Sequence, residues 1–215
     1  MTRTPWVVGV SGASGTPYAR AVINGLLDAG ESVDLVVSRA ARLTIRDETG
    51  LSFRDTHWRA DLEAWLGRDA HDTQYWTAGD LAAGPASGSY PTLGMVVVPA
   101  STAAVAGIAI GLSKDLLQRA ADVTLKERRR FVVVPRETPY TRATLQHMLT
   151  LHDAGAIVLP ASPGFYSAPQ SIAQLVDFVA AKVLDVLAVP HELITRWTGT
   201  LGGAADPGLA RRADR

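Results

Sequence analysis

The sequence predicts an α/β protein with three layers, in which helices cover both faces of a mostly parallel central sheet. Five short apolar runs rich in β-branched residues recur along the chain, at 6–10, 33–37, 95–98, 131–134 and 156–159, and each ends in small or polar residues. Runs as unbroken as these are typical of strands that are covered on both faces. Helical patterns lie between most of them, and this alternation of strand and helix favours a parallel sheet.

The helices are expected between and after these strands. Apolar residues recur at helical spacing over 18–29, over 101–112 running on to 130, over 142–154 and over 171–189. The segment 50–92 is less regular, and we expect a helix at 57–66, an extra strand near 73–77 and a mobile loop through 84–92. We therefore predict one domain over 1–197 and a tail, 198–215, that is flexible or ordered by a partner subunit.

The composition excludes several classes of function. The 215 residues include 21 basic and 21 acidic side chains, so nothing indicates a nucleic-acid or anionic-membrane partner. Without cysteine the chain has no disulfide, thiolate nucleophile or cysteine-based zinc site, which is compatible with a cytoplasmic protein. The apolar run near the N-terminus is too short and too rich in glycine for a signal peptide. The uncharged stretch 81–113 is broken by Pro99 and several glycines, so we expect a strand, a turn and a helix there instead of a membrane span.

A glycine-rich turn joins the first strand to the first helix. Gly9, Gly12 and Gly15 allow a tight turn, and free N–H groups at the helix start suit a phosphate or another anion, with Ser11 and Ser14 as further donors. We favour contact with a ligand over a turn that uses glycine for packing alone.

A dinucleotide reductase is the obvious rival explanation of this turn. The acidic residue that such an enzyme usually carries after the second strand is replaced by Ser38 and Arg39, of which Arg39 suits only NADP. No tyrosine is followed by a lysine four residues later, as a short-chain reductase would require. The reductase is therefore a minor alternative.

Polar or aromatic residues also follow the later strands. Ser101 and Thr102 open a helix, where plain N-capping and contact with a ligand are equally good explanations. The loop 160–166 is stiffened by two prolines and a glycine, and its residues Phe165 and Tyr166 either stack on a ligand or pack against the final helix. The histidines show no metal-ligand spacing, and we expect no metal.

The segment 119–139 combines a basic helix face with a charged pair at a strand end. Arg119 and Lys126 lie seven residues apart and share one helix face, and Arg136 and Glu137 follow the strand at 131–134 between two prolines. These four residues predict a cationic pocket with one acid, suited to a phosphorylated ligand. The alternative is a solvated helix with surface salt bridges.

Taken together, these blocks resemble the flavin prenyltransferases of the UbiX type, the partners of UbiD-type decarboxylases. The resemblance runs from about 6 to 197. Its most specific parts are GASG at 12–15, AST at 100–102, RAADVTLKERR at 119–129, VPRETP at 134–139 and LPASPGFYSAPQS at 159–171.

This resemblance implies a Rossmann-like (flavodoxin-like) flavin-binding domain. It implies transfer of a dimethylallyl group from dimethylallyl phosphate, or from the diphosphate in some members, to N5 and C6 of reduced FMN without a metal. The product, prenylated FMN, would serve a UbiD-type decarboxylase. Members of the family form homododecamers with sites between subunits.

The resemblance also implies roles for individual residues. The residues expected to hold FMN are Gly12, Ala13, Ser14, Ser38, Ser101, Thr102, Ala103, Ala104 and Arg136. The residues expected to hold the prenyl phosphate are Arg119, Lys126, Tyr166 and Lys182, with Trp197 near the prenyl group. Glu48 and Glu137 match acidic positions of the active site, and we expect Glu137, assisted by Lys126, to transfer protons.

Three departures from the family pattern bear on the donor. Ala100 replaces a common cysteine, Lys182 replaces the usual arginine, and Leu81 stands where an aromatic residue is often found. The sequence leaves open whether the donor is a monophosphate or a diphosphate and which decarboxylase receives the product. Two other functions remain as alternatives: a flavin-dependent decarboxylase of cysteine-like thiols with the same fold, and a non-catalytic FMN carrier.

Overall fold

The structure of the chain, a computed structural model, describes residues 4–165 and 168–196. Its centre is a sheet of six parallel strands in the order β3-β2-β1-β4-β5-β6. The strands are β1 (Trp6–Val10), β2 (Val33–Val37), β3 (Thr73–Thr77), β4 (Gly94–Ala100), β5 (Arg130–Pro135) and β6 (Ile157–Val158). The α-helices are α1 (Thr16–Asp28), α2 (Arg39–Thr49), α3 (Trp58–Leu66), α4 (Thr102–Ala109), α5 (Leu116–Lys126), α6 (Arg142–Asp153) and α7 (Ile172–Leu187), and the 3-10 helices are η1 (Asp55–His57) and η2 (Gly84–Ala86).

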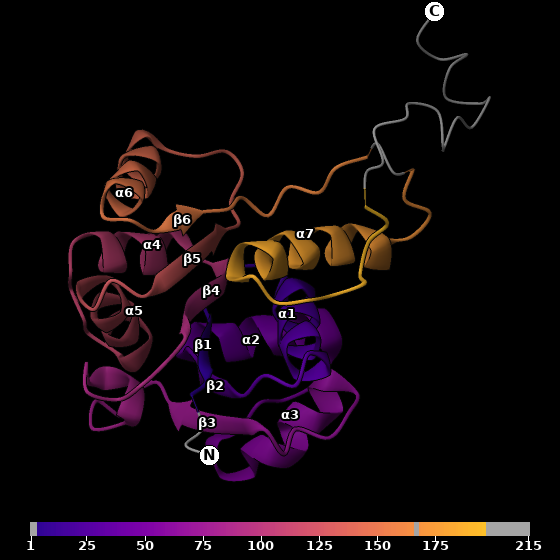
Figure 1. The fold of residues 1–215 in the computed structure, drawn as a ribbon, viewed down its shortest axis with the longest axis horizontal. Coiled ribbons are helices and arrows are strands. Elements are labelled where there is room, and N and C mark those ends of the chain that lie inside the picture. The colour runs from indigo at the N-terminus through magenta and orange to yellow at the C-terminus, as the bar shows by residue number, and fades with distance from the viewer. Residues whose placement is uncertain (1–3, 166–167, 197–215) are drawn as a thin grey trace, which may run out of the picture.

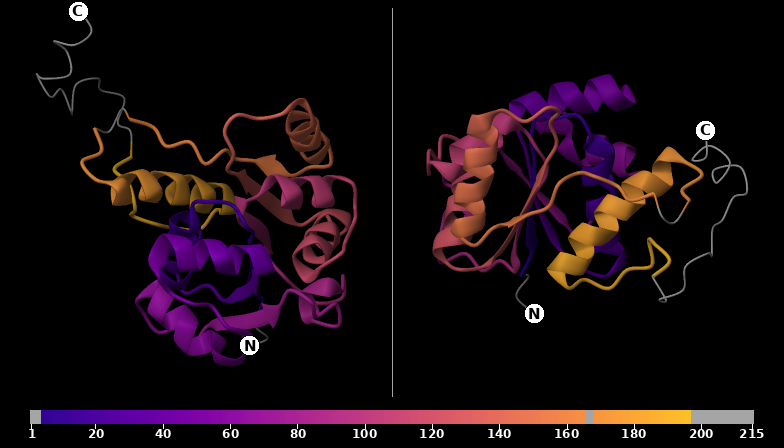
Figure 2. Two further views of the ribbon diagram at one scale, coloured as in Figure 1. Left: turned by 180° about the vertical axis from the view of Figure 1, so that it is seen from behind. Right: turned by 90° about the horizontal axis from the view of Figure 1, so that it is seen from above.

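Two layers of helices enclose the sheet (Figures 1 and 2). The helices α1, α2, α3 and α7 pack on one face, and α4, α5 and α6 pack on the other. Successive residues of a strand point to opposite faces, so Val8 and Val10 of β1 join the first core and Val7 joins the second. Both faces of the central strands are therefore buried, as the unbroken apolar runs predict.

The strand order reverses between β1 and β4, which lie side by side with Trp6 opposite Gly94. The full order is that of the doubly wound dinucleotide-binding sheet, and without the edge strand β3 it is that of flavodoxin. The predicted Rossmann-like (flavodoxin-like) fold is thus confirmed. Ligands of such sheets bind at the carboxyl ends of the strands beside this reversal, which directs attention to the residues after β1, β2 and β4.

The prediction of one long helix over 101–130 is wrong, because the chain forms two helices there. Helix α4 ends at Ala109, and Gly111 and Ser113 adopt positive φ angles of 65° and 48°, which stop a right-handed helix. Asp115 then starts α5, because its carboxylate accepts a hydrogen bond from the Gln118 N–H at 2.9 Å. The uncharged stretch 81–113 forms mainly β4 and α4, and within the described ranges no helix is long and apolar enough to cross a membrane.

Other differences concern the first half of the chain. Helix α2 was not predicted, because Ala41 and Ile45 are its only two buried residues and leave too weak an apolar pattern. The segment 84–92, expected to be mobile, is anchored instead: it contains η2, and Arg129 donates hydrogen bonds to the carbonyl groups of Gly88 (2.7 Å) and Tyr90 (2.9 Å). The helix at 57–66 and the strand at 73–77 are confirmed as α3 and β3.

Candidate active site

Three serines join the carboxyl ends of β1, β2 and β4 to the helices that follow. Ser38 caps α2 and Ser101 caps α4, with each hydroxyl accepting a hydrogen bond from a backbone N–H three residues later, at 3.1 and 3.2 Å. Ser11 bridges β1 and β4, because its hydroxyl donates to the Pro99 carbonyl (2.8 Å) and accepts from the Ser101 N–H (2.7 Å). The Ser11 hydroxyl, predicted as a ligand donor, therefore serves the fold.

A pocket of about 500 Å³ opens at this junction of strands and helices. It brings together five of the nine residues expected to hold FMN: Gly12, Ser38, Ser101, Ala103 and Ala104. The other residues of its wall are Ser11, Arg39, Ala40, Leu43, Lys114, Asp115, Leu117 and Gln118. The reversal of strand order thus brings these residues together from segments that are far apart in the sequence.

Gly12 is required by a close approach between the first turn and α2. A Cβ atom at this position would lie 2.3 Å from the Cβ of Ala40 and 3.1 Å from the Ala40 carbonyl carbon. Any side chain here would push α2 away from β1 and reshape the pocket wall. The glycine thus serves as the contact surface between two walls of the pocket.

The residues of this pocket fit FMN. The guanidinium of Arg39 and the ammonium of Lys114 provide positive charge, and α2 and α4 direct their amino ends toward the same space, which suits a phosphate. Leu43, Leu117 and the alanines of α4 provide an apolar wall for a flat ring system.

Glu48, expected in the active site, is bonded to the amino end of α1. Its carboxylate accepts hydrogen bonds from the N–H groups of Gly15 and Thr16, both at 2.8 Å, and from the Thr16 hydroxyl at 2.6 Å. Burial alone raises the pKa of Glu48, but hydrogen bonds from Thr16, Ser14 and Gly15 outweigh it and hold that pKa below its ordinary value. The helix start that was predicted to hold a ligand anion thus already holds a protein carboxylate.

Arg136 and Glu137 lie beside the same turn, at the carboxyl end of β5. The Arg136 Nε donates to the Ser14 carbonyl at 3.1 Å, and the Glu137 carboxylate accepts from the Thr138 N–H at 2.9 Å. Two tyrosines that sequence reasoning missed stand close to this pair. Burial and the Glu137 charge raise the pKa of Tyr140, and burial raises that of Tyr18 against the opposing effect of Arg136.

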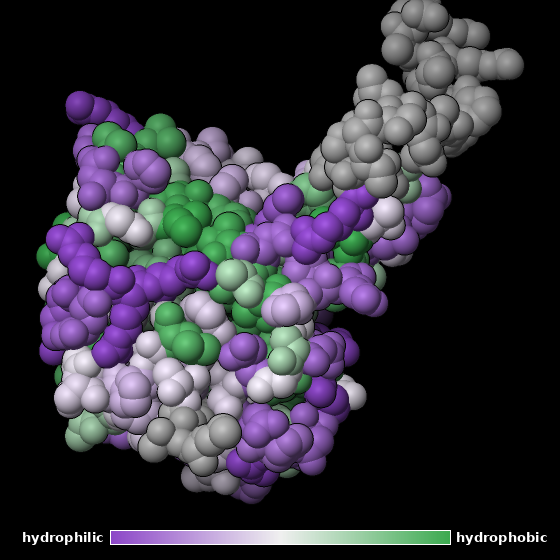
Figure 3. Space-filling model, in the orientation of Figure 1, coloured by the Kyte–Doolittle hydropathy of each residue, from purple (hydrophilic) through white to green (hydrophobic). Residues whose placement is uncertain are grey.

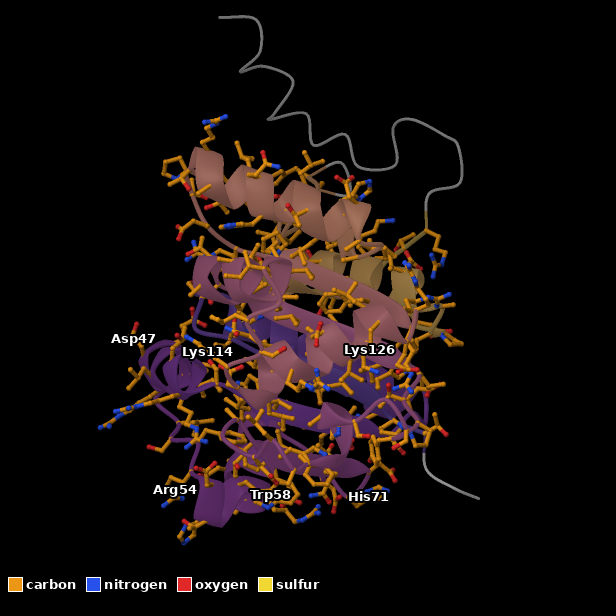
Figure 4. The ribbon with its side chains drawn as sticks, turned by 90° about the vertical axis from the view of Figure 1, so that its left-hand side faces the viewer. Asp47, Arg54, Trp58, His71, Lys114 and Lys126 are labelled. Carbon is orange, nitrogen blue, oxygen red and sulfur yellow. The ribbon has the colours of Figure 1, made fainter. Side chains whose placement is uncertain are left out.

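Arg119 and Lys126 share one face of α5, as predicted, and both lie against the segment that contains η2. Arg119 donates to the Ala86 carbonyl at 3.1 Å, and Lys126 forms an ion pair with Glu127 beside Gly88. Lys126 ends α5 four residues before β5 begins, whereas Arg136 follows the end of β5, about 20 Å away along six extended residues. In Figure 4, Lys114, just before α5, and Lys126, at its last residue, accordingly lie well apart.

The predicted pocket of Arg119, Lys126, Arg136 and Glu137 is therefore not assembled within one chain. A helix between two parallel strands runs antiparallel to them, so its last turn lies at the amino edge of the sheet. This rule could have predicted from the sequence that Lys126, in the last turn of its helix, lies far from Arg136. The start of α5, by contrast, lies at the pocket: Lys114 and the capping Asp115 precede the helix, and Gln118 lies in its first turn. The prediction of an unbroken helix concealed this.

A second groove, of about 380 Å³, runs between α7 and the chain after β6. It contains Lys182, the predicted phosphate-binding lysine, on a wall that is otherwise mostly apolar. The other lining residues are Leu159, Pro160, Ser162, Phe178, Val179, Asp185 and Val186.

The remaining predicted residues line neither the pocket nor the second groove, or lie outside the described residues. Ala13 lies in the first turn and Thr102 begins α4, while Ala100 is buried at the end of β4 and accepts a hydrogen bond from the Arg136 N–H at 3.2 Å. Leu81 is exposed. Tyr166, Trp197 and the tail 198–215 lie outside the described residues. Within the ranges 4–165 and 168–196, no group of three or more acidic or histidine side chains is placed to hold a metal ion.

The chain is similar to known flavin-binding proteins. The family model described as Flavoprotein matches residues 1–184. The chain is 65% identical over 215 residues to a flavin prenyltransferase UbiX of Streptomyces coelicolor, covering 95% of this chain and all of the relative.

Among solved structures, AnUbiX in complex with FMN and dimethylallyl pyrophosphate is similar, with a TM-score of 0.82, 35% identity and coverage of 93% of this chain and 100% of that one. A dodecameric FMN-dependent UbiX-like decarboxylase from Escherichia coli O157:H7 has a TM-score of 0.81 and 36% identity, covering 91% and 100% of the two chains. The peptidyl-cysteine decarboxylase EpiD shares the fold at only 13% identity and a TM-score of 0.56, covering 87% and 99%.

Proposed function

The chain belongs to the UbiX family of flavin prenyltransferases, and we propose that it transfers a dimethylallyl group from dimethylallyl phosphate, or from the diphosphate, to N5 and C6 of reduced FMN. The observation that carries this proposal is the pocket at the strand reversal, where Gly12, Ser38 and Ser101 meet a cationic and apolar wall. Prenylated FMN would then pass to a UbiD-type decarboxylase. The cytoplasmic location expected from the sequence stays a prediction.

The pocket residues would hold FMN by its two unlike parts. The amino ends of α2 and α4, with Arg39 and Lys114, suit the phosphate, and Leu43 and Leu117 suit the ring system. FMN, once bound and reduced, supplies the nucleophilic ring atoms, so the chain needs no nucleophile of its own. The absence of cysteine from the chain agrees with a reaction in which the protein supplies no nucleophile.

Cationic side chains assist the departure of the phosphate. When the allylic C–O bond breaks, its electron pair remains on the phosphate oxygen, and lysine or arginine groups stabilise that charge. We assign this role to Arg119, Lys126 and Lys182, with Tyr166 as a further ligand. Glu137, assisted by Lys126, would transfer the protons released as the new bonds form.

A complete site then requires more than one copy of the chain. Lys126 lies at the amino edge of the sheet, whereas the FMN pocket lies at the carboxyl edge, so a second copy would bring the face of its α5 that carries Arg119 and Lys126 to the pocket of the first. The described surface offers apolar contacts for this assembly: Leu145 and Leu149 of α6 and Ile157 of β6 are at least 40% exposed, and Figure 3 shows apolar surface between α6 and α7. The dodecameric E. coli relative supports a homododecamer.

The proposal is tested by one anaerobic assay. Purified protein is mixed with reduced FMN and dimethylallyl phosphate without magnesium, and the flavin product is weighed by mass spectrometry. A gain of one C5H8 unit, lost in Glu137→Gln, is the expected result. FMN that binds without any change of mass, with either donor, would contradict the proposal and favour the carrier; oxidation of a cysteine-like thiol would favour the decarboxylase.

A further inference from the structure

Asp185, on α7, joins three cationic or potentially cationic side chains beside the second groove. Its Oδ1 accepts a hydrogen bond from Arg196 at 2.8 Å and lies 3.1 Å from His191 Nε2, while its Oδ2 lies 3.6 Å from the Nζ of Lys182. Arg196 and His191 come from the chain after α7, so one carboxylate connects this segment to the helix. No role was expected for Asp185, His191 or Arg196.

The burial and orientation of His191 show that this cluster is built rather than incidental. Its side chain is only 2% exposed, and its Nδ1 accepts the Leu193 N–H at 3.3 Å. With Nδ1 as the acceptor, Nε2 carries the hydrogen that faces Asp185. Burial alone raises the pKa of Asp185, but hydrogen bonds from Arg196 and His191 hold it below its ordinary value. The carboxylate is therefore ionised and oriented by its two neighbours.

The cluster offsets the negative charge that Asp185 brings to the groove. Lys182 and Asp185 lie one helical turn apart and both line it. An unneutralised carboxylate at this distance from the lysine would repel a phosphate. The cluster keeps a net positive charge because Lys182 and Arg196 outweigh the one carboxylate. Since Arg196 and His191 are bound at Oδ1, Oδ2 remains available to hold the lysine ammonium at the groove.

We propose that Asp185 is a positioning residue for the prenyl donor: it holds the Lys182 ammonium over the groove, while Arg196 neutralises its charge and His191 fixes its orientation. The inference rests on the proposed function, since it takes the phosphate bound by Lys182 to be that of the donor. Asp185 acts through Lys182 and through the segment after α7, without contact with the reacting atoms.

The first test is Asp185→Asn, which keeps the shape of the side chain and removes its charge. The expected result is a rise of about tenfold in the KM for dimethylallyl phosphate, with kcat at saturating donor and the Kd for FMN within about twofold of the wild type. Asp177→Asn is the matched control, because Asp177 lies on the same helix outside the cluster. It should leave the donor KM unchanged.

A second pair of variants separates positioning from a merely structural role. Arg196→Ala should raise the donor KM, and Arg196→Lys, which keeps the charge, should restore it. A merely structural Asp185 would instead lower the melting temperature and the FMN affinity together with donor binding, and that result would overturn the proposal. So would an unchanged donor KM in Asp185→Asn when Lys182→Ala raises it.

Failure of the proposed function gives a different signature. If the wild type forms no prenylated flavin, the function is wrong, whatever Asp185 does. Calorimetric titration of dimethylallyl phosphate into the FMN-loaded wild type and Asp185→Asn still tests the inference. Weaker binding by the variant supports it, whereas absent or equal binding in the two proteins overturns it.

Discussion

The carboxylate of Glu48 caps the first turn of α1 by accepting hydrogen bonds from both the backbone N–H (2.8 Å) and the hydroxyl (2.6 Å) of Thr16. Glu48 lies near the end of α2, so this contact holds α1 and α2 together. The amino end of α1 already carries this negative charge. The starts of α2 and α4 are therefore the better places for a ligand phosphate.

Glu48→Gln should destabilise the protein in a pH-dependent way. The folded state lowers the pKa of Glu48 below its ordinary value of 4.5, so the stabilisation is present above that pH and is lost as the pH falls through the lower, folded-state pKa. We expect a loss of about 1 kcal/mol at pH 7. Urea unfolding of wild type and variant at pH 7 and at pH 3.5 to 4.5 measures it, with the neighbouring Asp47→Asn as control. A difference that grows at acid pH would contradict this account.

Gly12→Ala should weaken FMN binding and lower stability by about 1–3 kcal/mol, because its Cβ would lie 2.3 Å from that of Ala40. Flavin fluorescence titration and thermal unfolding measure the two effects. Ala40→Gly in the same chain should restore part of both, since it removes the atom in collision. Gly79→Ala is the control, because a Cβ there meets nothing within 4 Å. Equal effects at Gly12 and Gly79 would count against the close contact.

Mixed oligomers test whether two copies share one site. Lys126→Ala and Arg136→Ala should each be inactive alone, but co-expression should restore about a quarter of the sites if different copies supply the two residues. Co-expression of Lys126→Ala with Arg119→Ala should restore nothing, because both residues lie on one face of α5 and come from the same copy. Specific activity per flavin is the measurement. No recovery in the first mixture would mean that the site is not shared in this way.

Lys182→Arg should strengthen donor binding, because a guanidinium makes two parallel hydrogen bonds to a phosphate where an ammonium acts as a point charge. We expect the donor KM to fall about two- to fivefold, while Lys182→Met raises it. Steady-state assays with the monophosphate and the diphosphate give the comparison. A rise in KM with arginine would show that the groove is shaped for lysine.

Most of the architecture could be predicted from local pattern. The apolar runs of β1, β2, β4 and β5 locate these strands, because a strand buried on both faces is mostly apolar, with Asp34 of β2 as a buried exception. Helix α2 could not be predicted because only two of its residues, Ala41 and Ile45, are buried. The break between α4 and α5 could not be predicted because it depends on the backbone angles of Gly111 and Ser113, and many sequences allow such angles.

By itself, the sequence determined the α/β class and the family, and through the resemblance to that family it predicted Gly12, Ser38 and Ser101 as FMN-binding residues. These three residues meet because the carboxyl ends of parallel strands share one edge of the sheet. Only the tertiary structure decided which charges meet: that Glu48 binds α1, that Lys114 reaches the pocket and that Lys126 lies at the opposite edge. The reason is physical. Apolar periodicity reports burial along one element, whereas the distance between two charges depends on how separate elements pack against each other.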